Sequence, residues 1–486
     1  MRQTLWIGLL ALAGLGGCVV GPQYHPPTVP LPVTWSELPE SGVKSEPIAI
    51  AHWWSTLGDP VLNSLVERAV EANLDVRLAK ARVREARALR GVAAAGLWPT
   101  INGGGTYLRL RGSENTFSST STTSATGGGT SSGGATGFSL DGNLFQANFD
   151  ATWELDLFGR VLRSVEAAEA DIAAAEENQR DIFVTLVAEV ARNYAELRGV
   201  QSQLVVTRNN LHAQQQSVEI TNARFQAGLT SGLDVEQAEA QLATTQSQTP
   251  TLESARQQSI HRLGVLLGQL PETLIAELIP EQRLPLLPPE ITVGLPSELL
   301  RRRPDVRRAE RQMAAAIARI GVATADLFPR FTFSANVLGL QSADLADLAL
   351  ASSGFWSIGP AVSWPLFDAG HIRANIEVFN ARGEQSLVQY QQTVLVAVEE
   401  VENALVAFTQ ERLRHRALAA AVAANHRSVA LATERYTRGL GDFLNVLDAQ
   451  RSLYNAEDQV VQSQRTTVSN LIALYKALGG GWEVTP

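Results

Sequence analysis

The chain has 486 residues, of which 45% are hydrophobic and 18% charged, and its formal net charge is -9. This acidic balance argues against a general nucleic-acid-binding protein, which needs a basic surface to displace counterions from phosphates. The single cysteine excludes an internal disulfide and a cysteine-based metal site. No two of the seven histidines have helical metal-site spacing, and no P-loop, dinucleotide or nucleophile-elbow motif occurs. We therefore expect no enzyme, no metal and no bound cofactor.

Residues 1–17 have the pattern of a secretory signal peptide. Arg2 precedes an apolar run that is too short for a mature membrane helix. The small residues before Cys18 resemble the lipobox of bacterial lipoproteins, and this resemblance implies cleavage before Cys18 and its acylation, including palmitate. Several acyl chains anchor a protein more firmly than one. Val19 is compatible with sorting to the outer membrane. The alternative interpretation is an ordinary signal peptide followed by a chance cysteine.

The chain contains two tandem repeats. The recurring motifs are Leu97-Trp98-Pro99 with Leu327-Phe328-Pro329, Leu157-Phe158 with Leu366-Phe367, and the six residues 224–229 with 435–440. Their offsets are 230, 209 and 211. We interpret Asp368 and Ala369 as a two-residue insertion and assign about 21 extra residues to the first copy. Residues 118–137 are almost wholly Ser, Thr and Gly, so we expect a flexible loop there.

These repeats give a division of the chain into six segments. They are a signal peptide (1–17), a lipidated extended N-terminal segment (18–57), a first repeat (58–283), a proline-rich connector (284–296), a second repeat (297–479) and a C-terminal tail (480–486). Each repeat is expected to contain a helix, a β-hairpin, a long helix, a turn and a further helix.

Four segments show the alternation of apolar and polar residues that is typical of half-buried strands. They lie at 145–157, 331–337, 356–364 and, more weakly, 101–110. One such strand alone would suggest the edge of a soluble sheet. Four strands in two hairpins, on an expected lipoprotein, favour a membrane β-barrel.

The long helices carry apolar residues every seven positions, which indicates supercoiled packing. One stripe runs from Phe183 to Phe225 and the other from Val394 to Tyr436, where only His415 interrupts it. A helix over 160–228 would be about 100 Å long. Helices near 59–97 and 233–269 are each about half as long, so two could stack beside it. A coiled-coil tether without a pore is the alternative, and the strands argue against it.

Four strands cannot close a barrel, and eight enclose little more than their own side chains. Three chains related by cyclic symmetry would supply twelve strands and leave room for a lumen. The expected fold is therefore mainly α with a membrane β-barrel. Two tandem repeats per chain would build a trimer with a 12-stranded β-barrel that continues into a long periplasmic α-helical barrel.

Several motifs then point to a family. They are Trp53-Trp54, Asp59-Pro60, the run 81–87, the block 294–305 and the five residues 325–329. The chain resembles the TolC-type outer-membrane factors, most of all the lipoprotein branch that serves resistance-nodulation-division (RND) efflux pumps. The resemblance extends from the lipobox to about Gly479, and the connector block is its most specific part.

This resemblance implies the outer-membrane channel, or exit duct, of a tripartite efflux pump. The duct would passively conduct drugs, metabolites or other small toxic compounds. Its implied partners are two further copies in a homotrimer, a periplasmic adaptor protein, an inner-membrane RND pump and outer-membrane lipid, with no nucleic acid. The implied location is the outer membrane, with a lipid anchor and an extension into the periplasm.

The site residues follow in two groups. The turns Gly228-Leu229-Thr230 and Gly439-Leu440-Gly441 are ordinary helix ends, and the resemblance implies that they also contact the adaptor. The expected periplasmic gate comprises Asp234, Arg435, Tyr436, Leu444 and Asp448. Leu444 and Asp448 share a helix face, and the resemblance implies that Asp234, Arg435 and Tyr436 latch hairpins closed. The alternative for Asp448 is an ordinary solvated carboxylate.

Two rival functions stay open at this point. A duct of a protein-secretion system would share the architecture and differ in cargo. A periplasmic coiled-coil lipoprotein without a pore would lack conductance. The basic cluster Arg301-Arg302-Arg303 precedes Pro304, which suits a helix start, so we interpret it as a structural joint.

Overall fold

The computed structural model describes residues 19–36, 43–44, 51–111, 141–285, 287 and 291–482. The expected signal peptide 1–17, the expected lipidation site Cys18 and the Ser/Thr/Gly-rich run 118–137 lie outside these residues. The chain divides into two compact units. Unit 1 comprises Met1–Tyr24, Arg87–Glu169 and Ala314–Gly383, and unit 2 comprises His25–Ala86, Ala170–Met313 and Glu384–Pro486. Each unit takes segments from both repeats, so a repeat is not a compact body by itself.

The two repeats contain the same order of main elements. The first has α2 (Pro60–Ala72), α3 (Leu74–Ala95), β2 (Thr100–Arg111), β3 (Asp141–Leu155), α4 (Arg160–Gln226), α5 (Gly232–Gln246) and α6 (Gln248–Leu266). The second has α8 (Pro296–Arg302), α9 (Pro304–Ala325), β5 (Arg330–Ser342), β6 (Gly354–Ser363), α10 (His371–Thr437) and α11 (Phe443–Ala477). The helices α4 and α10 have 67 residues each and begin 211 positions apart. The helices α3 and α9 have 22 residues each and begin 230 positions apart.

Short elements connect these parts. They are β1 (Val43–Lys44), which pairs in parallel with β4 (Ile291–Thr292), the single turns η1 (Trp53–Leu57), η2 (Leu345–Asp347) and η3 (Ala351–Ser353), and α7 (Ile275–Leu278). None of the helices in the described part of the chain carries an apolar run of the length needed to cross a membrane.

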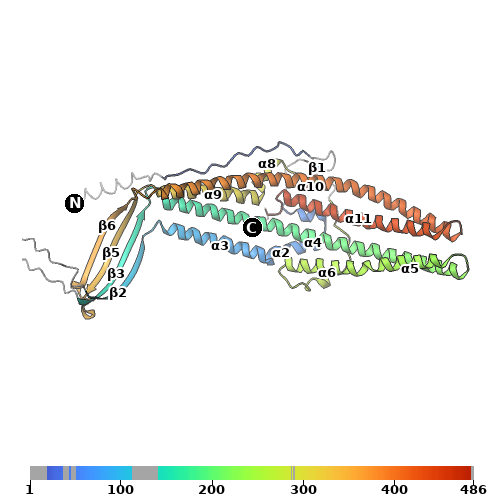
Figure 1. The fold of residues 1–486 in the computed structure, drawn as a ribbon, viewed down its shortest axis with the longest axis horizontal. Helices are drawn as coiled ribbons and strands as arrows, with labels where there is room; N and C mark the ends of the chain where they lie inside the picture. Colours follow the sequence, from blue (N-terminus) through green and yellow to red (C-terminus); the bar gives the residue numbers. More distant parts are fainter. Residues whose placement is uncertain are drawn as a thin grey trace, which may run out of the picture. The chain divides into compact units, whose positions relative to one another are not determined.

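The four predicted strands form one antiparallel sheet in the order β2-β3-β5-β6 (Figure 1). Each repeat contributes one hairpin. Ile101 pairs with Ala151, Ala151 with Ala335 and Ala335 with Ile358, so these apolar residues form one row across the sheet. The neighbouring row is polar and includes Thr152. The period-two pattern therefore gives one apolar and one polar face, as the sequence predicts.

The strand register corrects one repeat assignment. Thr152 of β3 pairs with the first residue of β2, and Ser363 of β6 pairs with the first residue of β5. These equivalent positions are 211 apart, so the Leu-Phe match at an offset of 209 is not a structural equivalence. The interpretation of Asp368 and Ala369 as an insertion is therefore wrong. A dipeptide match is weak because it recurs by chance, whereas a hydrogen-bonded register fixes every residue of a strand.

Tryptophan side chains support the corrected register. The indole N–H of Trp153 donates to the Leu97 carbonyl at 3.0 Å, and that of Trp364 donates to the Leu327 carbonyl at 3.1 Å. The donors are 211 positions apart and the acceptors 230 apart. The first repeat thus carries 19 extra residues between these landmarks rather than about 21.

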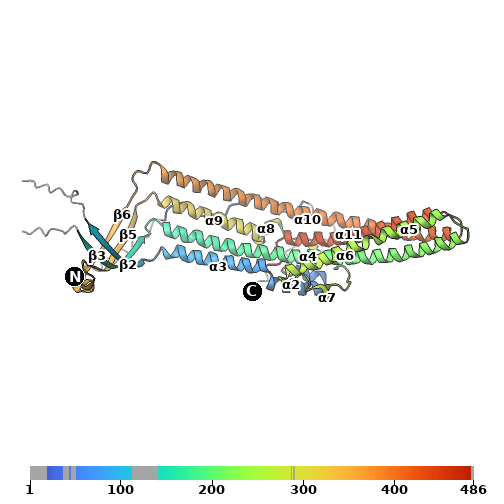
Figure 2. The ribbon, with the colours of Figure 1, turned by 60° about the horizontal axis from the view of Figure 1, so that its bottom comes forward.

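The predicted helices near 59–97 and 233–269 are each broken in two. At the first break, the Asn73 side chain accepts from the N–H groups of Asp75 and Val76 and donates to the Leu266 carbonyl at 2.8 Å. This cap ends α2 and starts α3. At the second, Pro250 in the first turn of α6 has no N–H to continue α5. Figure 2 shows α5 and α6 along α4, and α11 along α10.

The largest core joins α2, α4, α6, α10 and α11. Among its buried members are Trp53, Leu197, Ile260, Phe408 and Leu471. The heptad stripe of α4 is buried from Phe183 to Leu204, but it does not stay buried to the end of the helix, because Phe225 is 49% exposed. The buried side chains beyond Leu204 are polar: Thr207, Asn210, Gln214, Ser217 and Thr221. The expectation of apolar packing along the whole helix is therefore wrong for this end of α4.

Candidate functional site

The two hairpin turns are built alike. Gly228 and Gly439 both have positive φ, at 70° and 72°. The N–H of Leu229 donates to the Arg224 carbonyl, and the N–H of Leu440 donates to the Arg435 carbonyl, both at 2.8 Å. These are glycine C-caps of the kind that ends a helix. Leu229 and Leu440 are each 65% exposed, so the caps present one apolar side chain per turn to solvent.

The two hairpins meet at Tyr436, whose side chain is 4% exposed. The Arg224 guanidinium lies 4.8 Å from the centre of the tyrosine ring and donates to the Thr437 carbonyl at 3.0 Å. Phe443 lies on another side, with its ring centre 5.4 Å away. The sequence interpretation missed Arg224, although it is the repeat counterpart of Arg435, and that correspondence is the signal that would have identified it.

Hydrogen bonds continue from Tyr436 to Asp234. The tyrosine hydroxyl donates to the Thr230 hydroxyl at 3.4 Å, and the Thr230 hydroxyl donates to the Asp234 carboxylate. Ser231 donates to the same carboxylate at 3.5 Å. The structure thus brings Thr230, Asp234 and Tyr436 into one chain of contacts between the first and second hairpins.

The remaining gate candidates lie apart from this cluster. Arg435 donates to the Leu440 carbonyl of its own hairpin at 3.3 Å. Leu444 is 52% exposed, and Asp448, one turn further along α11, is also exposed. Within the described residues Asp448 makes no ion pair. Both side chains are therefore open to solvent, and their shared face is available to a partner or a lumen.

The predicted joint at Arg303 is a buried ion-pair cluster in unit 2. Arg303 pairs with Asp305 at 2.6 Å and with Glu400 at 2.7 Å, and it donates to the Ala477 carbonyl at 3.0 Å. Burial opposes ionisation of Asp305, but the hydrogen bonds and charge of Arg303 outweigh it and hold the pKa of Asp305 below its usual range. These contacts tie α9 to α10 and α11, as a structural joint requires.

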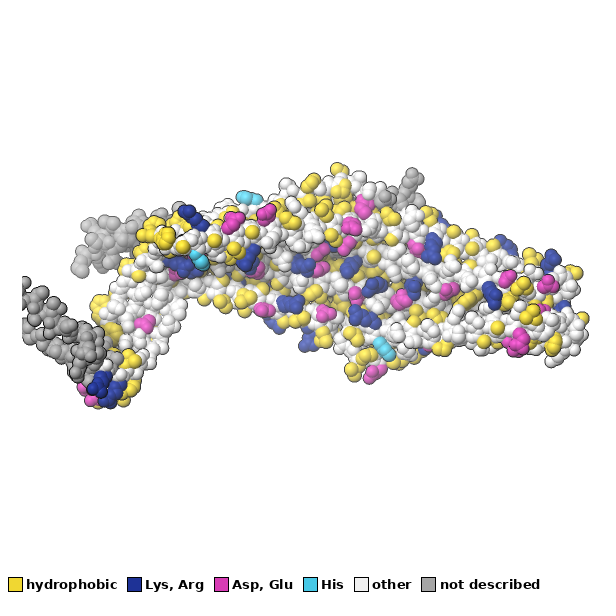
Figure 3. Space-filling view, in the orientation of Figure 1, with side chains coloured by type: hydrophobic (Ala, Val, Ile, Leu, Met, Phe, Trp, Pro, Cys, Tyr) yellow, Lys and Arg dark blue, Asp and Glu magenta, His cyan; other side chains and the backbone are white. Residues whose placement is uncertain are grey.

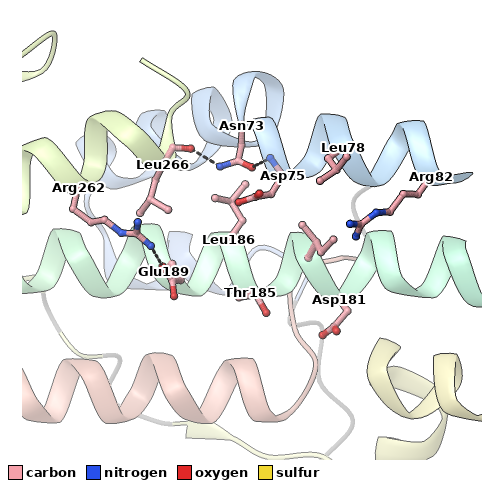
Figure 4. A pocket seen from close by; sticks show the side chains of 11 residues that line it. Asn73, Asp75, Leu78, Arg82, Asp181, Thr185, Leu186, Glu189, Arg262 and Leu266 are labelled. Atoms are coloured by element: carbon pink, nitrogen blue, oxygen red, sulfur yellow. Dashed lines mark hydrogen bonds and ion pairs between the residues drawn. The ribbon is translucent and has the colours of Figure 1, made fainter. Parts of the chain in front are cut away.

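A cavity of about 440 Å³ lies where the α2–α3 break meets α4 and α6 (Figure 4). Two of its polar side chains pair, Arg262 with Glu189 at 2.8 Å, and Asn73 donates to the Leu266 carbonyl. Asp181, on its wall, pairs with Arg308. These contacts join α6 to Asn73 and to α4, and we interpret this cavity as part of the helix joint.

Charges are dispersed on the surface. On the face shown in Figure 3, basic and acidic side chains are interspersed along the helices. Over the ranges described here, no three His, Cys, Asp or Glu side chains are grouped so that they could hold a metal ion. The candidate site therefore consists of the hairpin tips and the exposed face of α11.

Comparisons with known proteins identify the family to which the chain belongs. The family described as "Outer membrane efflux protein" matches residues 65–269 and 295–480, one stretch in each repeat. The chain is 31% identical over 481 residues to the solvent efflux pump outer membrane protein SrpC of Pseudomonas putida, covering 98% of both chains. It is 32% identical over 480 residues to the cation efflux system protein CusC of Escherichia coli O157:H7, again covering 98% of both.

A solved structure agrees with these relatives. The outer-membrane channel OprN is 35% identical to this chain, with a TM-score of 0.86, and the match covers 96% of this chain and 100% of that one. A family match over both repeats, full-length relatives and a shared fold lead to one conclusion. The chain belongs to the outer membrane efflux protein family and is an outer-membrane efflux channel.

Proposed function

We propose that three copies of this chain form the exit duct of a tripartite pump, joined to a periplasmic adaptor and an inner-membrane RND pump. The main observation that supports this proposal is the four-stranded sheet with one apolar and one polar face. Among the described strands, the outer ones, β2 and β6, each pair on one side only. Unpaired strand edges favour pairing with another chain. Three such sheets would close a twelve-stranded barrel, with the apolar faces toward lipid and the polar faces toward a water-filled lumen.

The hairpin turns are the proposed contact with the adaptor. Leu229 and Leu440 project from matching caps and are equally exposed, so three copies would present six similar apolar knobs. Exposed apolar side chains rimmed by polar ones are typical of interaction sites. The contacts from Arg224 and Thr230 to Tyr436 would hold the two hairpins of each copy together in the closed duct.

Asp448 is the proposed constriction residue, together with Leu444 one turn before it. Three exposed carboxylates near a common axis would narrow the duct and attract cations. We expect Asp448→Ala to raise the leak conductance of the purified protein in a planar bilayer and to lower its cation preference. Asp442→Ala, at the cap of the same helix, is the matched control. Unchanged conductance in Asp448→Ala would remove this residue from the gate.

A lipid anchor on Cys18 is the remaining part of the proposal. The residues that follow it are fixed in unit 1: the Val20 N–H donates to the Phe158 carbonyl at 3.2 Å, and Arg163 donates to the carbonyls of Val20 and Gly21. The chain that follows residue 18 therefore lies, at Val20 and Gly21, beside the turn between β3 and α4. We expect Cys18→Ala to abolish incorporation of labelled palmitate and to reduce the share of protein in the outer membrane. Normal labelling of that variant would refute the assignment.

The function is tested by a susceptibility profile of a deletion strain across antibiotics, dyes, detergents, solvents and metals. Selective sensitisation that the wild-type gene reverses supports efflux and identifies the class of cargo. Complementation of the deletion strain with the Asp448→Ala variant distinguishes loss of the gate from loss of the whole duct. A deletion that changes no susceptibility, with an altered set of exported proteins instead, would replace efflux by protein secretion.

A further inference from the structure

The apolar face of the sheet carries aromatic side chains near both of its ends. On β3, Phe145 and Trp153 lie eight residues apart on this face, and Tyr107 of β2 pairs with Phe145 in the strand register. The rings of Tyr107 and Phe145 lie 4.8 Å apart, and the tyrosine hydroxyl donates to Asn143 at 3.1 Å. The Trp153 indole donates to the Leu97 carbonyl just after α3, so this end adjoins the helices and the Tyr107 end is the outer one. Two aromatic girdles of this kind border the apolar band of membrane barrels.

The last residues of β2 continue the apolar face with positive charge. The pairing of β2 with β3 runs without a break from Thr100 to Arg111. Side chains two positions apart in a strand point to the same face, so Arg109 and Arg111 lie on the face that carries Ile101 and Tyr107. Both arginines are exposed. Two cations therefore follow directly after the outer aromatic girdle, on the face that would meet lipid in the proposed barrel.

The position of these arginines along the strands matches the thickness of a membrane. Arg109 pairs with Asn143, which lies ten residues before Trp153 on β3. Ten residues extend about 34 Å along a strand, and a strand tilt of about 40° reduces this to about 26 Å across the membrane. The apolar band of membrane barrels is about 25 Å tall. Arg109 would therefore lie where the lipid headgroups begin, and Arg111 just outside that level.

The positive charge at the outer end of the sheet is not matched by acidic side chains. Among the side chains that the structure describes, no carboxylate forms an ion pair with Arg109 or Arg111. Arg330 is the other basic residue of the four strands, and at the inner end of β5 it pairs with Asp326 at 2.5 Å. In Figure 3, basic side chains gather at the outer end of the sheet. The outer end thus presents two arginines that are open to an anionic partner.

We propose that Arg109 and Arg111 bind phosphate groups of the outer-leaflet lipid, a diphosphorylated glycolipid of the lipid A class. Guanidinium groups match phosphate oxygens with paired, charge-assisted hydrogen bonds. The occupant is a lipid because both side chains continue the apolar face, whereas an anionic cargo would pass along the polar face. This inference rests on the proposed barrel and adds a lipid that the barrel holds at its outer rim.

A carboxylate of a neighbouring copy is the competing occupant. In the proposed barrel, β2 of one copy would pair with β6 of the next, and Asp344 and Asp347 lie between β5 and β6. The Asp344 carboxylate already accepts from the Ala346 N–H at 3.3 Å. Ion pairs between copies would hold the trimer together without any lipid. The stability of the lipid-free trimer is therefore the measurement that separates the two occupants.

Lipid titration of the purified full-length protein tests the site. The protein is freed of lipid in mild detergent, and its binding of diphosphoryl lipid A is measured by native mass spectrometry. We expect the double variant Arg109→Gln with Arg111→Gln to bind about 30-fold more weakly than wild type, because each arginine near an anionic lipid surface contributes about a factor of five. The matched control, Arg427→Gln with Arg438→Gln, removes two exposed arginines in and after α10 and should bind like wild type. Lipid A without phosphates should bind weakly to all three proteins.

Three outcomes would overturn this assignment. The first is equal binding of diphosphoryl lipid A by wild type and by the variant that lacks Arg109 and Arg111. The second is equal binding by wild type of lipid A with and without phosphates, because acyl chains alone would then explain the contact. The third is loss of the lipid-free trimer in that variant, because the arginines would then pair with a neighbouring copy. Conductance of the same preparations in a planar bilayer tests the duct separately: a wild-type protein that conducts leaves the duct standing in all three cases, and one that does not conduct overturns the duct itself.

Discussion

The two halves of α4 within unit 2 pack against the rest of the chain in different ways. From Phe183 to Leu204 the buried stripe is apolar and belongs to the largest core of the molecule. From Thr207 to Thr221 the buried positions are polar, and Asn210 and Ser217 among them bond to α11. Asn210 donates to Glu457 at 2.9 Å in this second half. The same heptad spacing therefore gives apolar packing in one half of α4 and hydrogen-bonded packing in the other.

This difference indicates where the helices can rearrange. Removal of a buried leucine side chain costs about 2–5 kcal/mol, whereas a typical buried hydrogen bond contributes about 0.5–1.5 kcal/mol net. Hydrogen bonds such as Gln450 to Ser217 at 2.8 Å can also be exchanged for bonds to water or to the next residue along a helix. We infer that the half of α4 near the hairpin turns is the part that would shift if the proposed gate opens.

The largest expected effect comes from a substitution in the apolar half of α4. Leu197 is fully buried in the main core. Leu197→Ala should lower the stability of the detergent-solubilised protein by about 2–5 kcal/mol, measured as a lower midpoint of denaturant unfolding. Leu162→Ala on the same helix, at a position 47% exposed, is the control and should change the midpoint little. Equal losses in the two variants would contradict the assignment of the core.

A smaller effect of opposite sign is expected in the polar half. Gln214 is 3% exposed, and neither atom of its amide has a hydrogen-bond partner in the described part of the chain. Gln214→Leu should therefore stabilise the closed hairpins by about 1–2 kcal/mol and lower the open probability in a planar bilayer. Gln215→Leu, at the exposed neighbouring position, is the control. A destabilised or more conductive Gln214→Leu protein would show that the polar packing holds the gate closed.

The contrast also shows what sequence patterns can predict. Alternation located all four strands because one face of the sheet is apolar and the other polar, and seven-residue spacing located both long helices. The heptad did not predict the polar half of α4, because Gln214 and Thr221 occupy buried positions of the same spacing as Val218 and Phe225. Periodicity identifies a stripe, whereas burial also depends on which neighbouring helix covers it.

Part of the candidate site could likewise be predicted from sequence patterns, and part could not. Matching glycines predicted the two turns, and the family resemblance implied a latch that includes Asp234 and Tyr436. The contact of Arg224 with Tyr436 depends on how the two hairpins lie against each other, which no local pattern encodes. The break at Asn73 likewise depends on a carbonyl almost two hundred residues away, that of Leu266.

The smallest effect is expected at the charged joint around Arg303. Because the folded-state pKa of Asp305 is lowered, mainly by Arg303 acting against burial, its stabilising contribution is present above the unfolded pKa of about 3.9 and is lost as pH falls through the lower folded value. Asp305→Asn should lower stability at pH 7 by on the order of 1 kcal/mol, and the difference from wild type should shrink below about pH 4. Glu253→Gln, at a half-exposed ion pair with Arg256, is the control and should show little difference at either pH. A loss of stability in Asp305→Asn that persists unchanged in acid would mean that the joint depends on the shape of the side chain rather than on its charge. The apolar and the charged buried contacts would then differ in packing alone.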